Sequence, residues 1–176
     1  MQTRRTALAV FASALAVSSA AKAQQTPPPG SPLARPLAPG QIPGPYGDAI
    51  TADQAQRLVA AAFAEARRRN FQMAFAVVDP DGELVAFARL DGVQTASVQT
   101  AQNKARCAAR FRRSTLYWAQ QIAMGNLNLL SLEGVVAAEG GVPLVDAHGR
   151  VTGAIGVSGG TAQQDGEVAA AAIAAR

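Results

Sequence analysis

Residues 73–90 read MAFAVVDPDGELVAFARL, two short apolar runs on either side of a turn. The DPDG sequence at 79–82 combines residues that β-turns favour, and the run after it alternates as a half-buried strand does. A second pair of strands is expected near 142–145 and 151–157, joined by DAHG at 146–149. The sequence therefore predicts two β-hairpins.

Helical patterns surround these hairpins. Thr51 and Gln54 have the spacing of a capping box, and apolar residues recur at helical intervals from there to Asn70, a suitable C-cap. Further helices are expected at 97–113, 115–124 and 162–175. We assign 125–132 to a loop. The order helix, hairpin, helices, hairpin, helix predicts an α+β domain in which helices pack on an antiparallel sheet.

The N-terminus has the form of an export signal. Arg4 and Arg5 precede an uncharged apolar run, and Ala21-Lys22-Ala23 supplies small residues for cleavage. Residues 1–23 are therefore predicted to be a secretory signal peptide, and the protein is expected to be periplasmic or secreted. The paired arginines resemble a twin-arginine signal, but such pairs also occur in ordinary signals, so the export route stays open.

A proline-rich segment separates this signal from the domain. We predict a linker at 24–48 and one domain at 49–176. The apolar run of the signal is too short for a stable membrane span. Removing residues 1–23 takes away three basic residues and no acid, which lowers the formal charge from +4 to +1. Such a small excess gives no support to nucleic-acid binding.

Cysteine and histidine each occur once in the sequence, which excludes several classes of metal and catalytic site. Cys107 is the one cysteine, so a single chain has no internal disulfide and no Cys-based zinc or iron–sulfur site. His148 is the one histidine, which excludes sites with two histidines, and it is expected to be exposed in a hairpin turn. Ser158 has no convincing histidine to activate it, so a serine hydrolase is not expected.

Several segments are specific when their order and spacing are taken together. They are VVDPDGEL at 77–84, RLDG at 89–92, QNKAR at 102–106, GGVPL at 140–144 and GAIGVSG at 153–159, followed by Gln164-Asp165. This series resembles the GlcG/HbpS family of small haem-binding and haem-degrading-type domains, which is related to the C-terminal domain of PduO proteins. The resemblance covers nearly the whole domain from about residue 50.

The resemblance implies a three-layer α/β/α domain around a central antiparallel sheet, assembly into homo-oligomers, and haem binding. For some relatives it also implies an extracellular sensing role. Thr115 matches the position that the resemblance associates with iron ligation, while its neighbours Phe111-Arg112-Arg113-Ser114 are closer to the GlcG branch. The alternative role for Thr115 is the N-cap of the next helix, a position that threonine commonly occupies.

Haem binding needs an apolar slot and cations for two propionates. Arg106, Arg110 and Arg113 follow each other at i, i+4 and i+7 and are expected on one helical face, with Phe111 and Tyr117 lining a pocket. Tyr117 is also a chemically suitable iron ligand. The alternative for the arginines is a solvated basic face, or an interface with acidic residues of another subunit, namely Asp79, Asp81 or Asp91.

Three further features have two interpretations each. The glycine-rich run at 153–160 is either an anion-binding loop or a site of close backbone packing. Asp165 either binds a ligand or stabilises the first turn of the last helix, and Cys107 is either a nucleophile or a small buried residue. The expected function is that of an exported, oligomeric protein that binds haem or a related planar anionic ligand for storage or sensing. Haem degradation and a ligand-free accessory role in an exported oxidoreductase system are the alternatives.

Overall fold

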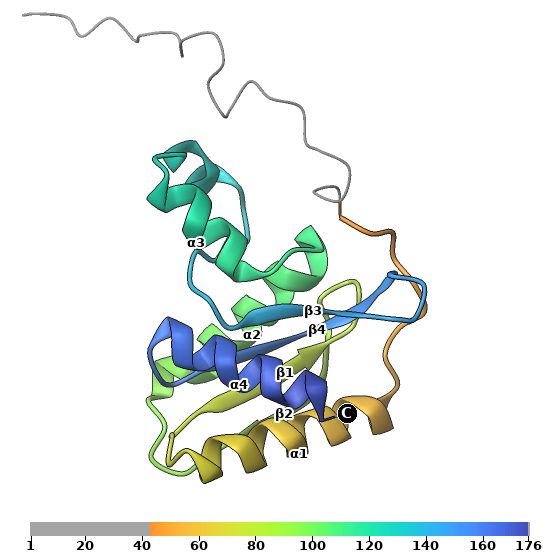
Figure 1. Ribbon diagram of the computed structural model, residues 1–176, viewed down its shortest axis with the longest axis vertical. Coiled ribbons are helices and arrows are strands. Elements are labelled where there is room, and N and C mark those ends of the chain that lie inside the picture. Colours follow the sequence, from red (N-terminus) through yellow and green to blue (C-terminus); the bar gives the residue numbers. More distant parts are fainter. Residues whose placement is uncertain (1–42, 176) are drawn as a thin grey trace, which may run out of the picture. The chain divides into compact units, whose positions relative to one another are not determined.

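The computed structural model describes residues 43–175, which belong to one compact unit. They form a four-stranded antiparallel sheet with strand order β2-β1-β4-β3 and helices on both faces (Figure 1). The elements in chain order are α1 (Ala52–Arg68), β1 (Ala74–Val78), β2 (Leu84–Arg89), α2 (Thr95–Phe111), α3 (Thr115–Ala123), the 3-10 helix η2 (Leu127–Ser131), β3 (Gly141–Val145), β4 (Val151–Ser158) and α4 (Ala162–Ala174).

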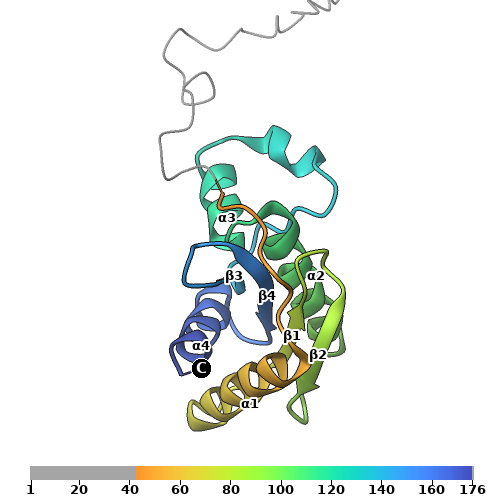
Figure 2. The same cartoon turned by 90° about the vertical axis from the view of Figure 1, so that its right-hand side faces the viewer.

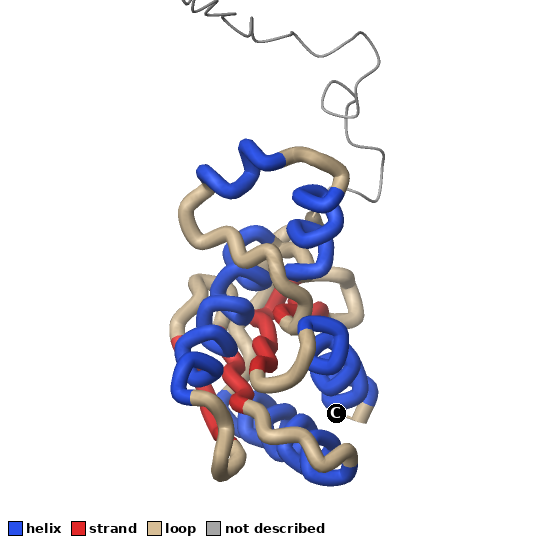
Figure 3. Tube along the Cα trace, turned by 90° about the vertical axis from the view of Figure 1, so that its left-hand side faces the viewer, coloured by secondary structure: helices blue, strands red, loops and turns tan. Residues whose placement is uncertain are grey.

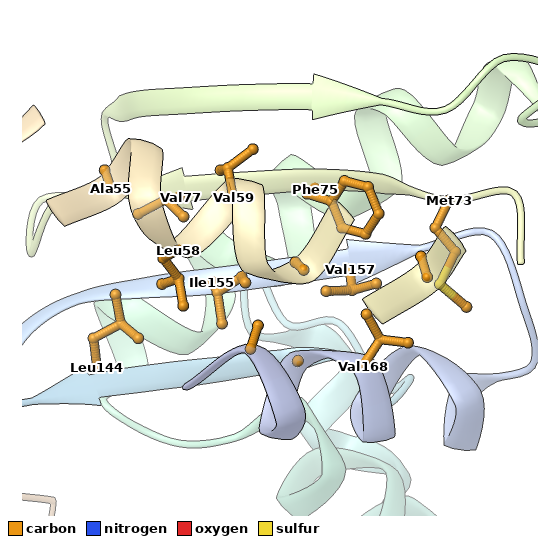
Figure 4. Packing of buried hydrophobic residues seen from close by; sticks show 14 residues of the cluster. Ala55, Leu58, Val59, Met73, Phe75, Val77, Leu144, Ile155, Val157 and Val168 are labelled. Carbon is orange, nitrogen blue, oxygen red and sulfur yellow. The ribbon is translucent and has the colours of Figure 1, made fainter. Parts of the chain in front are cut away.

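The sheet separates two hydrophobic cores. On one face, α1 and α4 pack against Phe75 and Val77 of β1 and against Ile155 and Val157 of β4 (Figure 4). On the other face, α2 packs against the alternate residues of β1, which are small. Both sides of β1 are covered, so the whole strand is buried. The predicted α+β fold with α/β/α layers is therefore confirmed.

Helix α2 approaches the sheet closely because small residues face each other across this contact. A Cβ atom at Gly156 of β4 would overlap the carbonyl oxygen of Ala101 in α2. A Cβ atom at Gly153 would overlap the carbonyl oxygen of Val78 in the neighbouring strand. Close backbone packing, one of the two interpretations of the glycine-rich run, is thus what the structure shows at these positions.

Residues before α1 form an arm along the start of β4. The Val151 N–H donates to the Pro45 carbonyl at 2.8 Å, and the Gly47 N–H donates to the Val151 carbonyl at 2.9 Å. The Tyr46 hydroxyl donates to the carbonyl of Arg110 near the end of α2, at 2.9 Å. The last part of the predicted linker therefore packs on the domain. The predicted signal peptide and the rest of the linker lie outside the described residues.

Local sequence signals account for both ends of α1. The capping box of Thr51 and Gln54 forms at the start of α1, and Asn70 follows the end of that helix in the left-handed conformation. The segment assigned to a loop at 125–132 contains η2, which with α3 projects at the end of the domain opposite α1 (Figures 2 and 3). Within residues 43–175, no helix has the length and apolar content to cross a bilayer.

Candidate functional site

Helix α2 and the loop between η2 and β3 enclose a hollow of about 600 Å³, a volume typical of small-molecule and cofactor pockets. Of the predicted binding residues, Arg106, Arg110 and Phe111 line it. The remaining lining residues are Asn103, Cys107, Glu133, Gly134, Val135 and Val136. Two hollows of similar volume lie beside α1, but none of the predicted binding residues lines either of them.

The two arginines of the hollow hold the turn between β1 and β2. Arg106 donates from Nε to the Gly82 carbonyl at 3.2 Å, and Arg110 donates from Nε to the Asp81 carbonyl at 2.9 Å. An Arg110 Nη atom also lies 3.7 Å from a Glu83 carboxylate oxygen. A guanidinium carries five N–H donors, so each arginine keeps donors for a ligand while its position is fixed by the turn. The two cations outnumber Glu133 in the lining, and the hollow therefore favours an anion.

Arg113 does not share the face of Arg106 and Arg110, contrary to the i, i+4, i+7 prediction. Helix α2 ends at Phe111, and Arg112 adopts a left-handed conformation with φ 53°. The chain therefore changes direction before Arg113, whose guanidinium instead stacks 4.5 Å from the centroid of the Tyr117 ring. Neither Arg113 nor Tyr117 lines the hollow.

Thr115 is the first residue of α3 and is completely buried. Its Oγ1 accepts from the Gly141 N–H at 2.9 Å, which joins α3 to the start of β3. Ser114 is the N-cap, with its side chain accepting from the Leu116 N–H, so the capping alternative for Thr115 is wrong. The Thr115 hydroxyl is buried, so iron ligation through it would require the residues that cover it to move.

An aromatic cluster backs the hollow. The Phe111 ring lies edge-on to Trp118, with 4.9 Å between centroids, and the Tyr117 ring also lies edge-on to Trp118, with 5.1 Å between centroids. The Trp118 indole N–H is buried and has no hydrogen-bond partner among the described residues. A buried donor without a partner costs free energy, and such groups are uncommon in native proteins.

Cys107 forms part of the wall and is buried. Its Sγ accepts from the Val136 N–H at 3.3 Å, which holds the loop against α2. Burial raises the pKa of this thiol, so the thiolate required of a nucleophile is disfavoured, in agreement with the interpretation of a small buried residue. His148 is exposed in the β3–β4 turn, as predicted. Among residues 43–175, no cluster of three or more His, Cys, Asp or Glu side chains suits a metal ion.

A buried ion pair lies at the junction of α2, β4 and α4. The Lys104 ammonium is 2.6 Å from an Asp165 carboxylate oxygen, and both side chains are 3% exposed. Lys104 also donates to the Val157 carbonyl at 3.2 Å, and Asp165 accepts from the Gly160 N–H at 2.9 Å. Burial raises the pKa of the Asp165 carboxyl, against the opposing effects of Lys104 and the backbone N–H.

The sequence offers two interpretations of Asp165 and places Lys104 in the QNKAR segment at 102–106, but it does not pair the two residues. Asp165 lies in the first turn of α4, where the helix dipole favours its charge, as one interpretation held. The available signal was Lys104 itself. It is the one lysine after Lys22 and falls among the buried alanines of α2, at a position where a cation needs a partner.

A family profile described as "Haem degrading protein HbpS-like" matches residues 50–174. The chain belongs to the HbpS-like family. The predicted GlcG/HbpS resemblance is thus confirmed. GlcG of Escherichia coli (strain K12) is 36% identical to this HbpS-like chain over 109 residues, which are 62% of this chain and 81% of that protein.

Two solved structures resemble this HbpS-like domain. The Klebsiella pneumoniae protein ORFY has a TM-score of 0.67 and 30% identity, over 73% of this chain and 90% of that chain. A second structure, a complex of PduOC with haem, has a TM-score of 0.66 and 26% identity, over 73% of this chain and 95% of that chain. That relative was therefore crystallised with the ligand class that the sequence resemblance implies.

Proposed function

We propose that this protein binds haem, or a related planar anionic tetrapyrrole, in the hollow beside α2. The observation that carries the proposal is the combination of an apolar wall with two fixed guanidinium groups in one hollow of about 600 Å³. Family membership and the haem complex of the relative PduOC support the same ligand class.

The residues of the hollow fit the two halves of such a ligand. Phe111, Val135 and Val136 offer apolar contacts to a macrocycle. Arg106 and Arg110 have donors left over for two propionates, since their hydrogen bonds to the turn use Nε. Bound haem would supply redox chemistry at its iron, while the chain's own residues would orient the macrocycle and neutralise its carboxylates.

We base the binding site on Arg106, Arg110 and Phe111. Arg113, Thr115 and Tyr117 lie outside the lining of this hollow.

We further propose that the protein is exported through its predicted signal peptide, is periplasmic or secreted, and works as a homo-oligomer in haem storage or sensing. Haem degradation is the second candidate function, which the description of the family favours.

A haem titration followed by visible absorbance tests the proposal. We expect a saturable, shifted Soret band with a defined stoichiometry. In Arg106→Gln/Arg110→Gln the dissociation constant should rise at least about tenfold, because charge-assisted hydrogen bonds are each worth roughly 1.5–3 kcal/mol. Arg57→Gln, which changes an exposed arginine on α1, is the matched control. A spectrum identical to that of free haem would refute haem binding and favour the ligand-free accessory role.

The same complex separates binding from degradation. With a reductant and air, a degrading enzyme converts bound haem to an open-chain tetrapyrrole, which is detected by mass spectrometry as the Soret band decays. A storage or sensing protein retains the band under the same conditions. Thr115→Ala, measured in parallel, tests ligation: an unchanged spectrum leaves Thr115 with its structural contact to Gly141, and a changed axial signature assigns it to the iron.

A further inference from the structure

Residues 115–132 form a projection with an unusual composition. This segment contains no Asp, Glu, Lys, Arg or His, although α2 before it carries a dense group of basic residues. It includes α3 and η2, which stand out from the sheet at one end of the domain (Figures 2 and 3). We call residues 115–132 the uncharged lobe.

The uncharged lobe exposes large apolar side chains. Met124 is 63% exposed, Leu127 61%, Leu130 58% and Leu132 44%. A 3-10 helix has three residues per turn, so Leu127 and Leu130 lie on the same side of η2. Exposed apolar side chains that gather in one place, unlike scattered single ones, mark interaction surfaces.

We propose that the uncharged lobe is a self-association surface whose occupant is the uncharged lobe of a second copy of this chain. Interface centres are depleted of charge and enriched in apolar residues, as this segment is. A twofold contact between two such lobes leaves no charge buried without a partner, and it keeps the arginines of the two α2 helices out of the contact. Stable interfaces use roughly 20–30 residues per side, so the exposed residues of the lobe would form the centre of such an interface and its neighbours the rim.

The composition argues against a membrane surface as the occupant. Interfacial segments combine apolar residues with Lys or Arg and with aromatic residues that reach the lipid. The uncharged lobe has no basic residue, and its Trp118 is only 6% exposed. A strongly charged protein partner would likewise find no complementary charge there.

This inference locates the surface of the homo-oligomer in the proposed function and is independent of haem. Sedimentation velocity of the purified protein over a range of concentrations, without haem, measures the association. We expect a reversible oligomer whose dissociation constant rises at least about tenfold in Leu127→Gln/Leu130→Gln. Leu84→Gln, which changes a 45% exposed leucine at the start of β2, is the matched control and should leave association unchanged.

Oxidative cross-linking provides a second readout of association that does not use a destabilising substitution of apolar residues. Cys107 is 1% exposed, so a cysteine introduced at exposed Asn128 of η2 would be the reactive thiol. Asn128→Cys should form a disulfide-linked dimer much faster than Gln56→Cys on α1. A wild type that stays monomeric at all concentrations overturns both the oligomer and its surface. An oligomer that is unaffected by the double substitution, in a variant with the wild-type circular dichroism spectrum, overturns only the surface.

Discussion

Lys104→Met is expected to lower the free energy of unfolding by about 3–5 kcal/mol, the range for removing one member of a buried ion pair. The ammonium and carboxylate lie 2.6 Å apart in a site where both side chains are 3% exposed. With an effective dielectric constant of about 20, two unit charges at that distance attract each other by about 6 kcal/mol, and the desolvation of both groups offsets part of this. Methionine retains much of the length and apolar stem of lysine, so the change isolates the charge.

The substitution leaves Asp165 buried without a cation. It keeps the hydrogen bond from the Gly160 N–H, but burial, which already raises its pKa, then acts without the opposing effect of Lys104. An acid whose folded-state pKa is raised becomes more destabilising as the pH rises above its unfolded pKa. The difference in unfolding free energy between the wild type and Lys104→Met should therefore be largest near neutral pH and shrink as the pH falls toward about 4.

Urea denaturation followed by the fluorescence of Trp118 and by circular dichroism measures these differences. Asp165→Asn and the double variant Lys104→Met/Asp165→Asn complete a double-mutant cycle, in which the double variant should be at least about 2 kcal/mol more stable than additivity predicts. Arg57→Met, at an exposed cation of α1, controls for the loss of one positive charge. The role assigned to this pair would be refuted if each single substitution lowered the free energy of unfolding by less than about 1 kcal/mol. It would also be refuted if the two losses added within about 0.5 kcal/mol in the double variant.

Three further predictions follow from particular contacts. Two arginines at the end of α1 lower the pKa of Glu65 from 4.5 to about 2. The Glu65 carboxylate therefore contributes stability above about pH 4.5, and this contribution is lost as the pH falls toward 2. Glu65→Gln should make the melting temperature less pH-dependent in that interval. Gly156→Ala drives a Cβ into the α2 backbone and should lower the free energy of unfolding by more than about 2 kcal/mol. Gly125→Ala has open space around it and should lower it by only about 1–2 kcal/mol, because of the positive φ at this position. Urea unfolding of the two variants compares these values. Tyr46→Phe removes the hydroxyl bond to the Arg110 carbonyl and should cost about 0.5–1.5 kcal/mol by the same assay.

Features that depend on neighbouring residues could be predicted from the sequence. The capping box at Thr51 and the DPDG turn at 79–82 are complete within four residues each, and the structure has both at the expected places. The two hairpins, each a turn between two apolar runs, likewise follow from neighbouring residues and form as expected. These elements, together with the family resemblance, were sufficient to predict the α/β/α fold.

Features that depend on contacts between distant residues were missed. Helical periodicity continues past Phe111 in the sequence, but the left-handed backbone of Arg112 ends α2. In this conformation the Arg112 side chain contacts the N-terminal arm, where it donates to the Gly44 carbonyl at 2.8 Å and lies over the Tyr46 ring. This moved Arg113 away from the predicted binding face. The partners Lys104 and Asp165 are 61 residues apart, and no local pattern joins them.

The two proposals meet in one short segment of the chain. The loop at 133–136 lines the hollow and follows directly after the uncharged lobe at 115–132, while the Val136 N–H ties it to Cys107 in α2. A lobe held by a second copy would restrict this loop, and haem against the loop would restrict the lobe. Binding free energies are reciprocal, so any factor by which association tightens haem binding must be the factor by which haem tightens association. Sedimentation with and without haem, set beside haem titrations above and below the dissociation constant of the oligomer, measures this one factor in two ways. A factor of one in both measurements would refute coupling between the hollow and the lobe through this loop.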